Sequence, residues 1–71
     1  MAVEPRIVVG RNISEERHRR GFTQEELAEA AGMHPVEVSR AERGVRDLRV
    51  STIAKLAAGL EVPARELLRG I

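Results

Sequence analysis

Two short helix-like segments, separated by a glycine, dominate the hydrophobic pattern of the chain. Thr23, followed three residues later by Glu26, has the spacing of a capping box and predicts the start of a helix. Apolar residues at helical spacing continue this helix to about Ala31, and Gly32 ends it. We therefore expect one short amphipathic helix followed by an abrupt turn.

A second short helix follows this turn. Pro35 suits the first helical turn, where a missing N–H group has no cost, and Gly44 predicts the end of the helix. Val38 and Ala41 point inward by their three-residue spacing. A tight helix–glycine–helix corner of this kind is typical of the helix-turn-helix unit.

Three further helices are expected around this unit. Ile7 to Arg20 is weakly amphipathic and ends at Gly21, and a more apolar helix begins at Val50 or Ser51, with Gly59 weakening its end. Pro63 begins a last short helix that Gly70 closes. The pattern predicts an all-α, compact five-helix domain over residues 7–71, preceded by an arm at residues 1–6.

Length and composition narrow the class of protein. The chain has 71 residues, no cysteine, two histidines and no apolar run near the roughly 20 residues of a membrane span. These features predict a single soluble domain in the cytoplasm, associated with the nucleoid when it binds DNA. They predict no disulfide, metal site or cofactor, no membrane partner and no small-molecule ligand.

The net charge of +1 does not by itself indicate a nucleic-acid partner. Eleven of the twelve basic residues are arginine, which suits bidentate contacts with phosphate and guanine. The only aromatic residue is Phe22, which argues against a platform for stacking single-stranded bases. Whether the chain binds nucleic acid therefore depends on where the arginines lie in the fold.

From Thr23 to Gly44 the chain reads TQEELAEAAGMHPVEVSRAERG. This segment resembles the helix-turn-helix regulators of the phage repressor, Cro and XRE type, and the resemblance extends from about residue 9 to residue 69. It implies a sequence-specific regulator that binds double-stranded DNA as a homodimer, on a palindromic operator. The loop Arg46-Asp47-Leu48 is similar to that of the small controller proteins of restriction–modification systems, and this similarity implies that the protein regulates its own gene.

The resemblance also implies roles for individual residues. The helix from about Pro35 to Arg43 resembles the recognition helix, and its base-contacting positions correspond to Pro35, Val36, Ser39 and Arg40. Phosphate-contacting positions correspond to Gln24, Arg43 and Arg46. Arg17 and Glu42 correspond to an ion pair that ties the first helix to the recognition helix.

A dimer interface is expected near the C-terminal end, because the last segment has more apolar side chains than a small core needs. A two-fold dimer would read two half-sites about 34–36 Å apart. The candidate interface residues are Leu60, Val62, Leu67, Leu68 and Ile71.

Several positions leave alternatives open. Glu16 is charged where many relatives have an apolar residue, and Val36 cannot donate hydrogen bonds, so it would contact a thymine methyl group. Glu37 could accept from cytosine or pair with Arg40 or Arg17, of which we favour a structural pairing. Arg40, Arg43, Arg46 and Arg49 could simply be a solvated face.

A protein-binding module and an enzyme are the two other classes of function that the sequence allows us to weigh. The same fold could be an antitoxin-like module that binds a protein partner, although the chain lacks an additional segment to wrap one. An enzyme is not expected, because we find no paired catalytic carboxylates, Ser-His-Asp set or phosphate-binding glycine loop.

Overall fold

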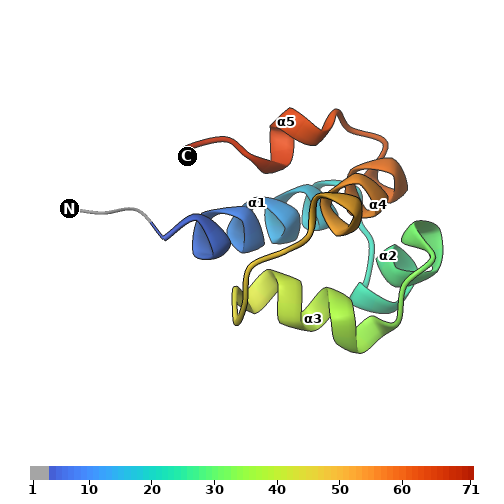
Figure 1. Ribbon diagram of the computed structural model, residues 1–71. Coiled ribbons are helices and arrows are strands. Elements are labelled where there is room, and N and C mark those ends of the chain that lie inside the picture. The colour runs from blue at the N-terminus through green and yellow to red at the C-terminus, as the bar shows by residue number, and fades with distance from the viewer. Residues whose placement is uncertain (1–3) are drawn as a thin grey trace.

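The computed structural model describes residues 4–71, which form five helices and no strand (Figure 1). The helices are α1 (Pro5–Arg19), α2 (Gln24–Ala31), α3 (Pro35–Arg43), α4 (Val50–Leu60) and α5 (Ala64–Leu67). Helix α1 packs on α3, α4 and α5, while α2 packs on α3 and α4. The predicted all-α, five-helix fold is confirmed, and no helix among residues 4–71 is long and apolar enough to cross a membrane.

The turn between α2 and α3 follows the predicted pattern. The hydroxyl of Thr23 accepts from the Glu26 amide at 3.0 Å, and the Thr23 amide donates to the Glu26 carboxylate at 2.8 Å. Gly32 ends α2 in the left-handed conformation with φ of 67°, which a residue with a Cβ atom rarely adopts. This geometry makes the corner that sets the direction of α3.

The ends of three helices differ from the predicted ones. Helix α1 begins at Pro5, because proline is accommodated in the first turn; residues 5 and 6 of the expected arm are thus helical, and residues 1–3 lie outside the described residues. Helix α4 continues through Gly59 to Leu60, and the glycine permits close packing on α2, since a Cβ atom there would lie 3.0 Å from the Ala31 amide nitrogen. Helix α5 is a single turn that ends before Gly70.

The core is aliphatic, as the composition predicts. Met33 and Phe22 are partly buried against its edge. Its buried apolar members come from all five helices and are Val9, Ile13, Leu27, Ala28, Ala31, Val38, Ala41, Leu56, Ala57, Leu60 and Leu67.

Candidate DNA-binding surface

Helix α3 buries one side and exposes the other. Val38 and Ala41 are buried in the core, whereas Val36, Arg40 and Arg43 are exposed. Pro35 and Ser39 are partly buried between these two sides. The four predicted base-contacting residues therefore each retain some accessible surface on one short helix.

The N-terminus of α3 is closed by a second capping box. The ring Nδ1 of His34 accepts from the Val36 amide at 3.2 Å, and the His34 amide donates to the Glu37 carboxylate at 2.9 Å. Glu37 thus has a structural partner, but this partner is the helix end and neither Arg40 nor Arg17. The cap thus gives the carboxylate of Glu37 a structural role, because it is held against the positive end of the helix dipole.

Arginine side chains gather on α3 and the loop that follows it. Among residues 4–71, Arg40, Arg43, Arg46 and Arg49 form no ion pair with a carboxylate. By contrast, ion pairs on other parts of the described chain hold five arginines, namely Arg6, Arg17, Arg19, Arg20 and Arg69. Four guanidinium groups without an ion pair in the described part of the chain outnumber the two carboxylates, Glu37 and Asp47, that lie among them, so this region carries a local positive charge that the net charge of the chain conceals.

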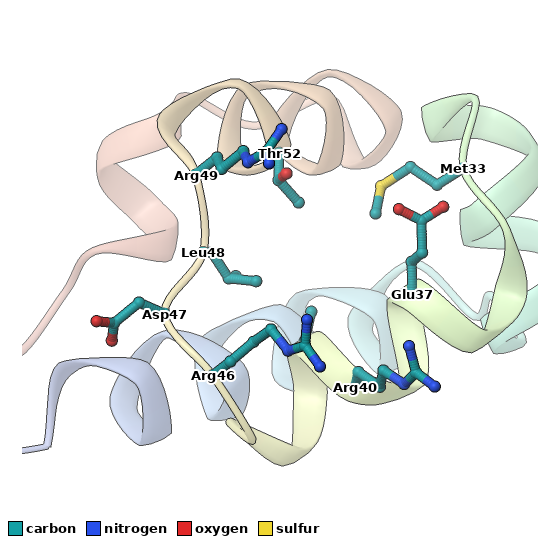
Figure 2. Close-up of a pocket in the computed structure, with 9 residues that line it drawn as sticks. Met33, Glu37, Arg40, Arg46, Asp47, Leu48, Arg49 and Thr52 are labelled. Carbon is teal, nitrogen blue, oxygen red and sulfur yellow. The ribbon is translucent and has the colours of Figure 1, made fainter.

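Three of these arginines, Arg40, Arg46 and Arg49, border an open hollow of about 350 Å³ between α3, the loop and the start of α4. Figure 2 shows Arg49 beside Thr52 on one side of the hollow, with Arg40 and Arg46 on the other side. Arg49 belongs to the run of arginines seen in the sequence, but the sequence did not assign it to the site.

A hydrogen-bonded cluster joins α1, α2 and α3 behind this surface. Arg17 donates to Glu42 through Nε at 2.6 Å and Nη2 at 3.1 Å, and through Nη1 to the Phe22 carbonyl at 2.8 Å. Gln24 donates its side-chain amide to the same Glu42 carboxylate at 3.0 Å. The structure thus brings the expected Arg17–Glu42 partners together and fixes Gln24 at the first residue of α2.

The candidate interface residues divide into two groups. Leu60 and Leu67 are completely buried in the core of their own chain, so their prediction as interface residues was wrong. Their periodicity is that of a core-facing side. Within one molecule α4 packs on α1, α2 and α5, and α5 packs on α1 and α4. Val62 is partly buried against the same core, while Leu68 and Ile71 remain exposed.

Comparison with known proteins agrees with this architecture. The helix-turn-helix family model HTH_3 matches residues 13–67, which cover the capped corner, the recognition-like helix and the two helices after it. The chain therefore belongs to the helix-turn-helix family of this type.

Individual relatives are consistent with this family. The chain is 40% identical over 63 residues to the Neisseria hypothetical transcription factor of Neisseria meningitidis serogroup B, and the match covers 89% of this chain and 59% of that protein. The crystal structure of a Neisseria hypothetical transcription factor superposes with a TM-score of 0.86 at 37% identity, covering 96% of this chain and 80% of that one.

A third comparison concerns the restriction–modification controller protein C.AhdI from Aeromonas hydrophila. Its crystal structure superposes with a TM-score of 0.84 at 35% identity, covering 87% of this chain and 94% of that chain. The expected resemblance to controller proteins is thus supported at the level of the whole fold.

Proposed function

We propose that this protein binds a palindromic operator in double-stranded DNA as a homodimer, with α3 of each copy in the major groove. The observation that carries the proposal is the set of unpaired arginines on α3 and the following loop. In a major groove, the exposed side of α3 faces base edges while the flanking arginines reach phosphates.

Within this proposal, the base-contacting residues are Pro35, Val36, Ser39 and Arg40. Arg40 can donate two hydrogen bonds to guanine, and Val36 can contact a thymine methyl group. Gln24 and Arg43 would contact the backbone on either side of the groove, together with Arg46. The bond from Gln24 to Glu42 supports this role, because it leaves one amide proton and the carbonyl oxygen of Gln24 for other partners.

The similarity to C.AhdI suggests a more specific role. We infer that the protein is controller-like and regulates its own gene, at an operator near its own promoter. A reporter gene placed behind that promoter would respond to added protein under this proposal. An unresponsive reporter would separate DNA binding from autoregulation.

The direct test is selection of bound duplexes from a random pool. The proposal predicts enrichment of an inverted repeat whose half-sites are separated by about one helical turn, roughly 34–36 Å. Enrichment of a single unrepeated half-site would contradict the dimer on a palindrome. If the protein retains duplexes but no sequence is enriched among them, sequence-specific recognition is contradicted.

A further inference from the structure

The amides in the first turn of α3 all end on one residue, His34. Pro35 has no N–H group to satisfy. The amides of Glu37 and Val38 donate to the His34 carbonyl at 2.9 Å and 3.4 Å. The amide of Val36 donates instead to the ring Nδ1 of His34, at 3.2 Å. The ring therefore completes the start of the helix, since it accepts from an amide that would otherwise be left over at a helix N-terminus.

This bond from Val36 requires a neutral ring. An imidazole nitrogen accepts a hydrogen bond only when it carries no proton, and a protonated imidazole donates from both nitrogens. Because Nδ1 is the acceptor, the proton of the neutral ring lies on Nε2. A proton added to Nδ1 would meet the Val36 N–H group head on, and it would place a positive charge at the positive end of the helix dipole. The cap and the protonated ring thus exclude each other.

Other polar contacts of this kind in the molecule do not share the dependence on a neutral ring. Helix α2 begins with the Thr23 hydroxyl, which accepts from the Glu26 amide at 3.0 Å and does not change charge near neutral pH. His18 is the second of the two histidines, and its Nδ1 lies 2.7 Å from the Ser14 carbonyl oxygen. A carbonyl oxygen only accepts, so this nitrogen donates, and its bond survives protonation.

The amide that His34 holds belongs to a proposed base-contacting residue. Val36 is 45% exposed and lies one turn before Arg40, on the same side of α3. In helix-turn-helix proteins the N-terminal residues of the recognition helix contact base edges. An apolar contact with a thymine methyl group depends on close approach, so a small displacement of the first turn would remove it. The order of this turn therefore bears directly on recognition.

The charged groups around the first turn offer the ring no ready ion pair. Across residues 4–71, the His34 ring pairs with no carboxylate. Glu37 already accepts from the His34 amide at 2.9 Å, and if a charged ring drew this carboxylate away, the second bond of the cap would be lost as well. The other charged residues on α3 and on the elements beside its first turn are Arg40, Glu29 in the last turn of α2, and Arg46, Asp47 and Arg49 around the hollow that Glu37 lines.

We propose that His34 is a positioning residue for DNA recognition, and that protonation of its ring weakens operator binding by opening the start of α3. This inference rests on the proposed function, because it assigns the first turn of α3 to the operator. It adds a residue outside the base-contacting and phosphate-contacting sets, and it gives recognition a dependence on pH that the Thr23 cap of α2 does not have.

The test is the affinity for the selected operator and for random duplex, measured at about pH 7.5 and about pH 5.5 at one ionic strength. Histidine is the side chain that ordinarily changes charge between these values, and it is roughly nine-tenths protonated at the lower one. We expect the operator affinity of the original chain to fall about three- to tenfold at the lower pH. Affinity for random duplex should stay equal or rise, because a charged ring is attracted to phosphate.

Two variants separate the cap from the charge. His34→Asn keeps an acceptor at the N-cap and cannot titrate, so its operator affinity should be the same at both pH values. His34→Ala has no acceptor, so its operator affinity should be low at both pH values. The matched control is His18→Asn, which removes the other histidine and should keep the pH dependence of the original chain. If His34→Ala does not fold, the pH dependence of His34→Asn decides.

NMR spectroscopy follows the cap without DNA. In the neutral protein, ¹⁵N spectra of the rings should place the proton of His34 on Nε2 and that of His18 on Nδ1. The chemical shift of the Val36 amide should change as His34 is protonated. An unresponsive Val36 amide, or a His34→Asn variant with the pH dependence of the original chain, would overturn the positioning role. Equal affinities for operator and random duplex at the higher pH would instead contradict the proposed function.

Discussion

Glu42 is the residue on which three helices converge. Its carboxylate accepts from Arg17 of α1 and from Gln24 of α2, while Glu42 itself belongs to α3. The side chains of Glu42 and Arg17 are only 7% and 12% exposed, so solvent screens their pairing far less than that of a surface ion pair. One side chain therefore fixes both the position of α3 and the orientation of Gln24.

Replacing this carboxylate should destabilise the fold measurably. We predict that Glu42→Gln lowers the free energy of unfolding by about 2–4 kcal/mol, because the Arg17 guanidinium loses its anionic partner in a largely desolvated site. Urea denaturation followed by circular dichroism would measure it. The matched control is Glu61→Gln, which removes the exposed partner of Arg20 and should cost no more than about 1 kcal/mol. Equal losses in the two variants would contradict the special role of Glu42.

The sequence predicts the partner of a side chain well where that partner is close along the chain. The caps at Thr23 and Gly32 depend on residues within one helical turn, and both are present as predicted. Glu16 illustrates the opposite case. Its burial is sustained by Arg69, and no local pattern in α1 indicates that this partner exists.

At the level of helices, the contact between α1 and α3 depends on a glycine. A Cβ atom at Gly10 would lie 2.6 Å from the carbonyl oxygens of Ala41 and Glu42, which belong to the backbone of α3 and cannot move aside. Gly10 therefore lets α1 approach the recognition helix closely, with backbone against backbone.

Substitution at this crossing should separate the two helices. We predict that Gly10→Ala destabilises the protein by about 1–3 kcal/mol, since overpacking outweighs the roughly 1 kcal/mol gain in helix propensity. For a domain of this size each kcal/mol corresponds to a fall of about 4–8 °C in Tm, which calorimetry would detect. Arg11→Ala, at the neighbouring exposed position of α1, is the control and should change Tm little. A higher Tm for Gly10→Ala would show that the helices are not in close contact there.

The number and order of the helices could be predicted from the sequence. Which element covers the apolar side of each helix could be predicted less well. Hydrophobic spacing distinguishes the buried side of α4 and α5 from the exposed side, yet it does not say whether the same chain or another chain covers that side. The same spacing therefore predicts an interface at Leu60 and Leu67, although both are completely buried in the core of their own chain. The start of α1 was missed because Pro5 can either precede a helix or begin one.

For the molecule as a whole, the distribution of charge matters more than its total. With a net charge of +1, the chain still concentrates unpaired arginines on α3 and the next loop, and it neutralises others through ion pairs. The arginines that carry the proposed function thus lie on one short helix and the loop after it.

The central claim is that the exposed side of α3 reads bases, and Arg40 tests it most directly. The measurement is the affinity of Arg40→Ala for the selected operator and for random duplex, at one fixed salt concentration. The control is Arg65→Ala, an exposed arginine on α5 that pairs with no carboxylate among residues 4–71. We predict that Arg40→Ala loses about 1–3 kcal/mol on the operator, roughly 5- to 150-fold, with a much smaller loss on random DNA and none in the control. An operator affinity equal to that of the original chain would contradict the account.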